Sequence, residues 1–294
     1  MPIAQSGHTL RTCAFLLLAL VGSRQPVFAQ DAPEDPAALQ VAEPEYRLIN
    51  LPTTMLLPRN RMSFDLTHRF AGNLRGRSFG DIAGDLFGLD EGAIIGLELR
   101  YGVWDHVQAA FYRTSFDKTI QLHGKYDAIR QQQSMPVSIS PLVSIEGTNN
   151  FQEDYAPAVG VVVSRIVGTR VAAYITPMWV GNTAAALASI DHGHDDGYTD
   201  TTQSPHTNRS TTYVGVGGRL RMGGASYVAA EIVLRARGYA PDEPAYGISV
   251  ERRVGGHTFS LTFTNTFGTT FAQLARGGAA NSLYLGFNLG RKFF

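Results

Sequence analysis

The stretch RMSFDLTHRF, residues Arg61–Phe70, decides the fold class because apolar and polar side chains alternate along it. Every second residue from Met62 onward carries an apolar side chain or a ring, and the residues between them are polar or charged. Successive side chains of a β-strand point to opposite faces. The stretch therefore predicts a strand with one apolar face and one polar face.

The same period of two recurs along the chain and predicts about twelve strands. We expect them near residues 61–70, 95–103, 107–111, 120–128, 135–146, 159–163, 171–180, 211–221, 228–235, 246–251, 258–264 and 283–290. An even number of strands that closes on itself is how a sheet crosses a bilayer. The predicted fold class is all-β: a single up-and-down antiparallel transmembrane β-barrel.

The predicted connections alternate in length, which separates a membrane barrel from a soluble sandwich. Most of the connections expected at one end are long, as at 71–92, 147–156, 181–210 and 266–280, whereas tight turns are expected near 104–106, 168–169, 223–225 and 253–256. Outer-membrane barrels place short turns in the periplasm and longer loops outside, and sandwiches show no such bias. We expect both chain ends in the periplasm and the loop 181–210 on the cell exterior.

Residues 1–29 have the order of a secretory signal peptide: a basic Arg11, an apolar run too short to span a bilayer, and small residues up to Ala29. Residues 30–57 are predicted to be a periplasmic leader, and residues 58–294 the barrel. The single cysteine, Cys13, lies in the predicted signal peptide, so the exported chain is expected to have no disulfide and no thiolate metal site. The predicted location is the bacterial cell outer membrane.

The segment LFGLDEGAIIGLELRYGVWDHVQAAFYRTSFDKTIQLHGKYDAIRQ, Leu86–Gln131, carries a family pattern of FGLD-x-A, LGL-x-YG, R-x-S-x-x-KT and KY-x-x-x-RQ. It is matched here at Phe87–Asp90, Tyr101–Gly102, Arg113–Ser115, Lys118–Thr119, Lys125–Tyr126 and Arg130–Gln131. The segment resembles a family of bacterial outer-membrane β-barrels catalogued as a domain of unknown function. Ala110 stands where that family often has glycine. The resemblance implies an outer-membrane barrel and brings no catalytic residues.

Charged residues of both signs occupy the polar face of the predicted strands and are candidates to line the lumen. They are Arg61, Asp65, Arg69, Glu98, Arg100, Lys125, Asp127, Glu146, Glu231, Arg235 and Glu251. An isolated charge in a low-dielectric interior is costly, so these groups must be paired or hydrated. Two interpretations stay open: a network of ion pairs that stiffens a narrow lumen, and a hydrated pore with a charged constriction.

The remaining chemistry-bearing residues predict neither catalysis nor a cofactor. His192, His194 and Asp195 form a weak metal candidate, but they lie in the longest predicted loop, where a solvated polar segment is the simpler interpretation. His257 and Ser260 are three residues apart, which places them on opposite faces of a strand. Acidic and basic residues balance at 25 each, which points to no nucleic-acid partner.

The expected partners are outer-membrane lipid, small solutes and the barrel-assembly machinery, because the terminal Phe294 resembles the C-terminal signal that this machinery reads. Trp104, Trp179, Tyr155 and Tyr213 are expected in the two aromatic girdles of a barrel. The leading functional hypothesis is a porin-like passive pore for small solutes. The alternative is a sealed barrel that acts as a structural or partner-binding platform through its loops.

Overall fold

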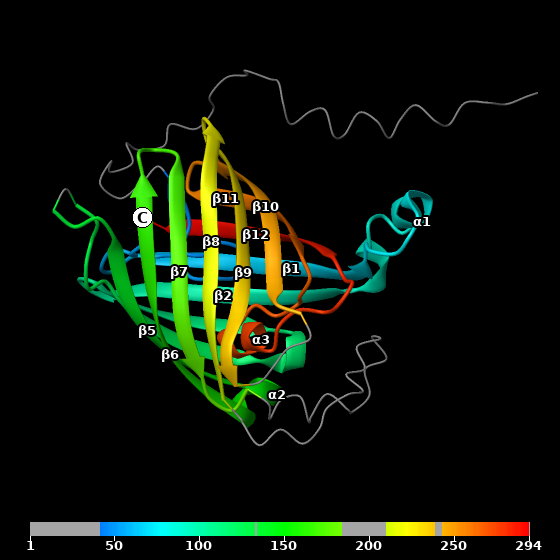
Figure 1. The fold of residues 1–294 in the computed structure, drawn as a ribbon, viewed down its shortest axis with the longest axis horizontal. Coiled ribbons are helices and arrows are strands. Elements are labelled where there is room, and N and C mark those ends of the chain that lie inside the picture. The colour runs from blue at the N-terminus through cyan, green and yellow to red at the C-terminus, as the bar shows by residue number, and fades with distance from the viewer. Residues whose placement is uncertain (1–41, 133, 184–209, 239–242, 294) are drawn as a thin grey trace, which may run out of the picture. The chain divides into compact units, whose positions relative to one another are not determined.

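The computed structural model describes residues 42–132, 134–183, 210–238 and 243–293, and in these ranges twelve antiparallel strands form a closed barrel (Figure 1). The strands are β1 (Met62–Asn73), β2 (Ala93–Trp104), β3 (Val107–Thr114), β4 (Ile120–Tyr126), β5 (Ser138–Gly147), β6 (Glu153–Val167), β7 (Val171–Val180), β8 (Thr211–Gly223), β9 (Ser226–Gly238), β10 (Ala245–Val254), β11 (His257–Thr264) and β12 (Tyr284–Phe293). The predicted fold class is confirmed.

Each strand pairs with its neighbours in the chain, and the ring closes where β1 pairs with β12. At this seam Leu66 lies opposite Leu289, and Asp65 lies opposite Gly290. Apolar residues therefore meet on one face of the sheet and polar or small residues on the other, as the period of two requires. A sheet closed in this way leaves no unpaired edge.

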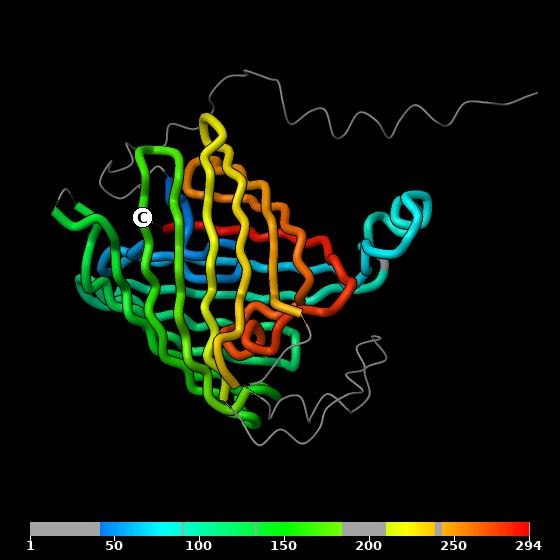
Figure 2. Tube along the Cα trace, in the orientation of Figure 1, coloured from blue at the N-terminus to red at the C-terminus, as the bar shows by residue number. Residues whose placement is uncertain are grey.

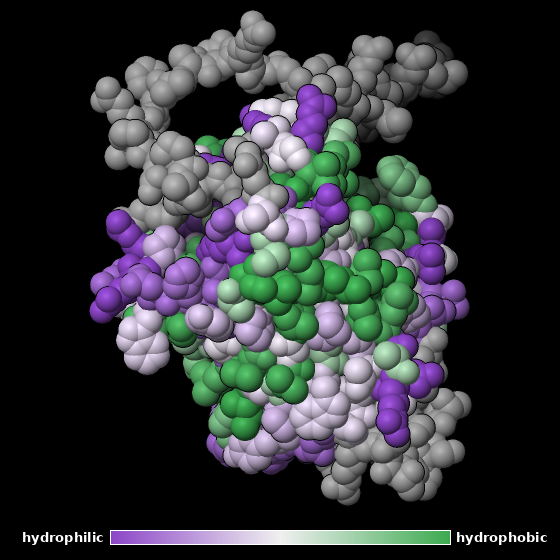
Figure 3. Space-filling model, turned by 60° about the vertical axis from the view of Figure 1, so that its left-hand side comes forward, coloured by the Kyte–Doolittle hydropathy of each residue, from purple (hydrophilic) through white to green (hydrophobic). Residues whose placement is uncertain are grey.

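The outer face of the wall is apolar and the inner face is polar. Residues such as Leu97, Val143, Ile175 and Leu261 expose their side chains outward, and apolar side chains gather in patches across the wall (Figure 3). The residues between them are buried toward the lumen. A barrel that presents this outer surface faces hydrocarbon rather than water.

Aromatic residues mark both ends of the outer wall. Trp104, Trp179 and Tyr155 are exposed, as expected for girdle residues. The expectation for Tyr213 is wrong: it lies on the inner face of β8, fully buried, and its hydroxyl donates to Met178 Sδ over 3.0 Å. Tyr213 is an even number of residues from Arg219, which faces inward, and an odd number from Val216, which faces outward.

Tight connections cluster at one end of the barrel, which we call the turn end. Glycines make these turns possible: Gly168, Gly224 and Gly255 adopt left-handed φ angles of 58°, 54° and 57°, which a Cβ atom disfavours. The opposite end, the loop end, carries the helices α1 (Phe79–Gly84), η3 (Leu89–Glu91), η4 (Phe116–Lys118), α2 (Thr148–Phe151) and α3 (Phe271–Ala275). Among the described residues, no helix is both long and apolar enough to cross a membrane.

Helix α1 begins at a capping box. Ser78 accepts a hydrogen bond from the backbone N–H of Asp81, and the Asp81 carboxylate accepts one from the backbone N–H of Ser78. The hydrogen bonds from the Ser78 side chain and backbone hold the pKa of Asp81 below its usual value.

Two chain segments fold into the barrel, which the sequence patterns do not predict. Residues 42–57 are buried among the inward side chains over most of their length, although residues 30–57 were expected to form a leader outside the barrel. The connection 265–283, expected to be an outer loop, brings α3 inward, and all five residues of α3 are buried. Figure 2 shows both segments, blue and orange-red, within the outline of the strands. The predicted signal peptide and the loop 184–209 lie outside the described residues.

Candidate functional site: a charged lumen filled by two chain segments

Residues 42–57 form a hairpin, which we call the plug hairpin. The backbone N–H of Leu48 donates to the carbonyl of Leu51 over 2.7 Å, and that of Thr53 donates to the carbonyl of Tyr46 over 3.0 Å. The chain therefore reverses at Ile49–Asn50. Both arms return to the turn end: Lys292, near the end of β12, donates to the carbonyl of Pro44, and the other arm leads into β1.

The tip of the plug hairpin is held by one carboxylate of the wall. Glu231, on the inner face of β9, accepts hydrogen bonds from the successive backbone N–H groups of Ile49, Asn50 and Leu51, at 3.0, 2.8 and 3.0 Å. These donors lie inside the barrel, and leaving them without an acceptor would cost about 1–3 kcal/mol each. A charged acceptor makes the bonds stronger than neutral ones. Glu231 is thus the principal anchor of the tip.

Basic and amide side chains of the wall hold the rest of the hairpin backbone. Lys125 donates to the carbonyls of Thr53 and Met55, the latter over 2.8 Å. Gln108 donates to the Met55 carbonyl and accepts from the Leu57 N–H, both at 3.2 Å. Backbone groups that the hairpin does not pair internally are therefore satisfied by side chains of the lumen wall.

Ion pairs complete this attachment. The hairpin residue Arg47 pairs with Glu98 on β2 over 2.6 Å, and Arg100 binds the other oxygen of the same carboxylate. Arg219 on β8 pairs with Glu251 on β10 over 2.7 Å and also donates to the Arg47 carbonyl over 2.9 Å. Each buried charge in this network therefore has an oppositely charged partner, as burial requires.

Two glycines on the inner face of β8 make room for the hairpin. A Cβ atom at Gly215 would lie 2.7 Å from Leu51 Cδ2, and one at Gly217 would lie 2.3 Å from Leu48 Cδ2. Glycine inside a strand marks a place where another chain segment approaches closely. Leu48 and Leu51 pack in the same apolar cluster as Phe271.

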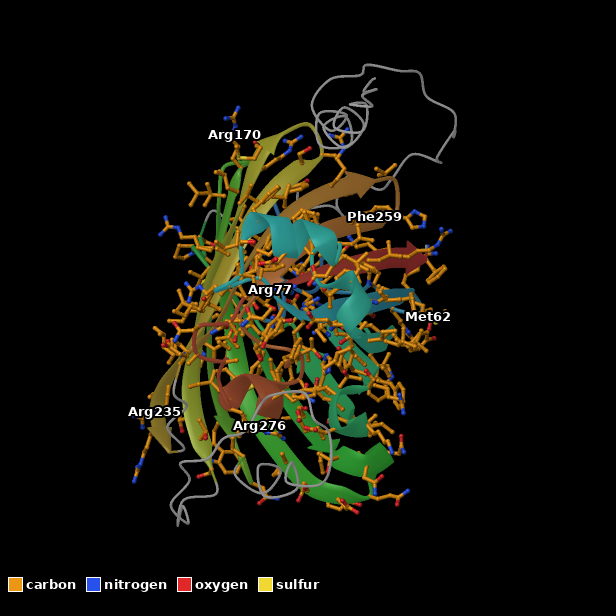
Figure 4. All side chains as sticks on the ribbon, turned by 90° about the vertical axis from the view of Figure 1, so that its right-hand side faces the viewer. Met62, Arg77, Arg170, Arg235, Phe259 and Arg276 are labelled. Atoms are coloured by element: carbon orange, nitrogen blue, oxygen red, sulfur yellow. The ribbon has the colours of Figure 1, made fainter. Side chains whose placement is uncertain are left out.

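The α3 segment is anchored at the loop end. Glu146 on β5 accepts from the Thr270 hydroxyl over 2.8 Å and from the Ala272 N–H over 3.1 Å. The Tyr112 hydroxyl donates to Thr269 Oγ1 over 2.6 Å, and Arg47 of the plug hairpin donates to the Thr269 carbonyl over 3.2 Å. The two inserted segments therefore meet inside the barrel. Figure 4 shows Arg276, which follows α3, on the same inserted segment.

The space left beside the hairpin is small. A cavity of about 10 Å³ lies between Glu45 of the hairpin and Asp65, Ser260 and Asn288 of the wall. This volume corresponds to about one water molecule. Polar side chains and the two inserted segments therefore occupy the lumen around this cavity. A larger cavity, of about 290 Å³, is lined by Arg75, Glu243, Tyr246 and Asn265 at the loop end.

Nine of the eleven charged candidates are buried, eight of them on the inner face of the strands and Asp127 just beyond β4. They are Asp65, Arg69, Glu98, Arg100, Lys125, Asp127, Glu146, Glu231 and Glu251. All of them except Asp65 make a hydrogen bond or an ion pair. Two of these contacts are not described above: Asp127 pairs with Arg130 over 2.5 Å, and Arg69 donates to Asn50 Oδ1 over 3.0 Å. Their burial places these charges between the wall and the inserted segments rather than along an open channel.

The predictions for Arg61 and Arg235 are wrong, because both side chains are exposed. Arg61 precedes β1 and lies at the turn end, where the wall stops. Arg235 still pairs with Tyr213 on β8, but it lies beyond Val233, the residue that pairs with the first residue of β10, so β10 does not reach it. Figure 4 shows the Arg235 side chain pointing away from the barrel.

The weak metal candidates His192, His194 and Asp195 lie outside the described residues. Within the described ranges, no group of three or more His, Cys, Asp or Glu side chains is placed to hold a metal ion. His257 and Ser260 lie on opposite faces of β11, since Ser260 is buried inward and His257 contacts Arg291 on the outer face.

The hairpin residues were missed because they lack a strand period. Tyr46, Leu48, Ile49 and Leu51 form an apolar cluster in a segment otherwise rich in proline and acidic residues, which was one available signal. The inward glycines at 215 and 217 were a second signal, because they predict that something approaches the inner wall of β8.

Comparison with known proteins supports a membrane barrel. A family model described as "Membrane bound beta barrel domain (DUF5777)" matches residues 45–293, a range that includes most of the plug hairpin. None of the curated proteins compared matches the chain.

Solved structures with a similar strand arrangement include three outer-membrane proteins. A triple mutant of the Rhodopseudomonas blastica porin is 13% identical over 68% of this chain and 55% of its own, with a TM-score of 0.33. The porin NanC is 7% identical over 80% of this chain and 99% of its own, with a TM-score of 0.46. An active-site mutant of outer membrane phospholipase A from Escherichia coli is 7% identical over 86% of this chain and 98% of its own, with a TM-score of 0.44.

The chain thus spans about half the length of the Rhodopseudomonas blastica porin. Likeness at these TM-scores does not extend to function, so the assignment rests on the family match together with the closed barrel. The chain belongs to the membrane bound beta barrel domain family DUF5777, and its lumen contains a hairpin that the family match largely includes.

Proposed function

We propose that the protein is a plugged barrel of the bacterial outer membrane, closed at rest, which passes small solutes when the plug hairpin leaves the lumen. The observation that carries the proposal is the filled interior, in which the tip of the hairpin is bound by Glu231 through three backbone N–H groups. A permanently open, porin-like lumen would need this space to be hydrated. We therefore favour a closed resting state over free diffusion.

The topology of the hairpin permits its withdrawal. Its tip points into the barrel while both arms lead to the turn end, so the hairpin can leave without threading a chain end through the wall. Its anchors are mainly hydrogen bonds and ion pairs, which water can replace when the segment moves out. The charged lumen side chains would then line a hydrated path.

A reversible cross-link tests the proposal. A Cβ atom at residue 215 would lie 3.3 Å from Leu51 Cγ, which marks about the place of the Sγ atom of a cysteine at residue 51, so the two side chains are close enough for a disulfide. The variant Leu51→Cys/Gly215→Cys should therefore tether the hairpin to β8 when oxidised. The chain's own cysteine, Cys13, lies in the predicted signal peptide.

Single-channel current across a planar bilayer is the measurement. We expect the oxidised variant to stay closed, the reduced variant to show brief openings, and a variant lacking residues 42–57 to conduct steadily. Steady current through the oxidised variant would show that the hairpin does not close the barrel. The single variant Leu51→Cys, which cannot form the cross-link, is the control for the reducing agent.

The α3 segment favours a second candidate function, a sealed platform that acts through its loops. This segment is held at the loop end by Glu146 and does not depend on the hairpin for that anchor. If removal of residues 42–57 produces no current although the protein is folded, the lumen is sealed twice and the platform is the better proposal. Neither candidate involves catalysis or a cofactor.

The proposed location rests on the family and on the predicted signal peptide. It implies contact with outer-membrane lipid and delivery by the barrel-assembly machinery through β12. Fractionation of the exported protein with the outer membrane is the expected result.

A further inference from the structure

Three outward-facing arginines lie near the turn end of the wall, on strands spread around the barrel. Arg165 on β6, Arg252 on β10 and Arg291 on β12 are each third from the end of their strand. All three are exposed, and each is followed two residues later by an exposed apolar side chain, Val167, Val254 or Phe293. Each of these arginines therefore interrupts the apolar outer face of its strand at the same distance, in residues, from the end of the strand.

This level fits the boundary between hydrocarbon and headgroups. Two residues nearer the middle of the wall, on the same outward face, lie Val163, Val250 and Leu289. A step of two residues is about 6–7 Å along a strand. An arginine at this position keeps its stem against the apolar wall while its guanidinium reaches the polar layer.

Neighbouring side chains do not neutralise these arginines. Arg252 donates to the Ser226 hydroxyl over 2.8 Å. The Arg291 guanidinium contacts His257 and lies 5.2 Å from the centre of the Phe293 ring. None of these three partners carries a negative charge. The turn end also carries exposed Arg170, which points away from the barrel in Figure 4.

The two ends of the barrel differ in their charge. Among the described residues, Asp105 is the exposed carboxylate at the turn end, since Asp127 and Glu251 are buried. The loop end carries exposed carboxylates, such as Asp81 and Glu153, as well as exposed arginines. The positive charge of the outer surface is therefore unbalanced at the turn end.

We propose that Arg165, Arg252 and Arg291, which are spread around the barrel and which we call the basic row, each bind anionic headgroups of phospholipids in the membrane leaflet at the turn end. A guanidinium donates two parallel hydrogen bonds to a phosphate and keeps its charge at all physiological pH values. An anionic lipid such as phosphatidylglycerol carries a net charge that the zwitterionic phosphatidylcholine lacks. The row thereby selects the lipids that surround the barrel, a property that does not depend on the plug hairpin.

Lipid selectivity of the full-length protein purified from membranes tests this assignment. The protein is reconstituted in phosphatidylcholine vesicles, and spin-labelled phosphatidylglycerol and phosphatidylcholine compete for the lipid shell around it. We expect a several-fold preference for phosphatidylglycerol at low salt, which weakens at high salt. The variant Arg165→Gln/Arg252→Gln/Arg291→Gln should bring the preference close to parity.

Matched variants separate the row from other sources of selectivity. Arg113→Gln/Arg235→Gln/Arg237→Gln removes the same charge from the loop end and should keep the preference. Arg165→Lys/Arg252→Lys/Arg291→Lys retains the charge and should keep most of it. If the triple glutamine variant does not fold, each single glutamine variant should still lower the preference by a measurable fraction.

Three results would overturn the proposal. One is equal binding of both lipids by the unmodified protein, and the second is an equal loss in the loop-end control, which would indicate net charge alone. The third is that the protein prefers phosphatidylglycerol only in the variant Asp31→Asn/Glu34→Gln/Asp35→Asn, which removes acidic residues that precede the plug hairpin in the chain. That result would mean that this acidic segment, rather than lipid, occupies the row in the native chain.

Discussion

At the scale of single residues, Glu231 combines a full charge with three backbone donors on one short turn. In the variant Glu231→Gln a single amide oxygen faces these three donors. We expect docking of the plug hairpin to weaken by about 2–4 kcal/mol, because hydrogen bonds to charged groups are worth about 1.5–3 kcal/mol each. The measurement is the maleimide labelling rate of a cysteine at residue 48, introduced as Leu48→Cys, which should rise.

The control for this variant is Glu153→Gln, which also removes one negative charge but from an exposed position at the loop end. It should leave the labelling rate unchanged. Equal rates in Glu231→Gln and in the parent would show that Glu231 does not hold the tip.

A second residue-scale prediction concerns the space at Gly215. A Cβ atom there meets Leu51 Cδ2 at 2.7 Å, so Gly215→Ala should weaken hairpin docking by about 1–3 kcal/mol. Adding Leu51→Ala removes the clash, so the double variant should lose less than the sum of its parts. Gly124→Ala is the matched control, because a Cβ atom there has its nearest neighbours at 3.9 Å. Strict additivity would contradict the contact.

Side-chain direction was predictable from the sequence wherever a strand was correctly placed. The period of two assigned Glu98, Arg100 and Lys125 to the inner face, where they are buried. The prediction of buried side chains fails at Arg61 and Arg235. Alternation along a strand gives the direction of a side chain, but it does not show whether the neighbouring strands extend far enough to cover it. The strands that carry Glu98, Arg100 and Lys125 contain no signal that a second chain segment buries these groups.

At the scale of elements, the wall of the barrel should tolerate charge according to depth. Leu261, near the middle of β11, and Val254, at the end of β10, both face outward and are exposed. We expect Leu261→Arg to destabilise the barrel by about 2–4 kcal/mol and Val254→Arg by about 0–1 kcal/mol. The measurement is urea unfolding followed by heat-modifiable gel mobility, and equal losses would contradict the membrane placement.

Strands were the predictable elements because each one contains its own period. All twelve expected strands are present, but several ends differ from the expected bounds, as in β6, which begins at Glu153 and not near residue 159. The plug hairpin was not predictable in this way. Its backbone is satisfied by Glu231, Lys125 and Gln108, which are far from it in the chain. No pattern within residues 42–57 encodes these partners.

At the scale of the whole molecule, the sequence predicted the barrel wall but not the two segments that fill the lumen. Alternation is a property of each strand and identifies a closed wall, whereas the filling of the lumen depends on which segments return into it. The inward-folded 265–283 segment was expected as an outer loop because length alone does not distinguish a loop that projects from one that folds back. The filled lumen favours a plugged barrel over a freely open pore.

The seam between β1 and β12 gives the plug hairpin a further consequence, in the order of assembly. The hairpin directly precedes β1, and its carbonyls at Ile49 and Pro44 accept from Asn288 and Lys292 on β12. Arg69 on β1 joins Asn50 of the hairpin to Asn288 of β12 by hydrogen bonds of 3.0 and 2.8 Å. The first and last strands of the chain thus share a common template on the inside. If the hairpin binds before the barrel closes, it holds the unpaired edges of β1 and β12 in register before these two strands pair.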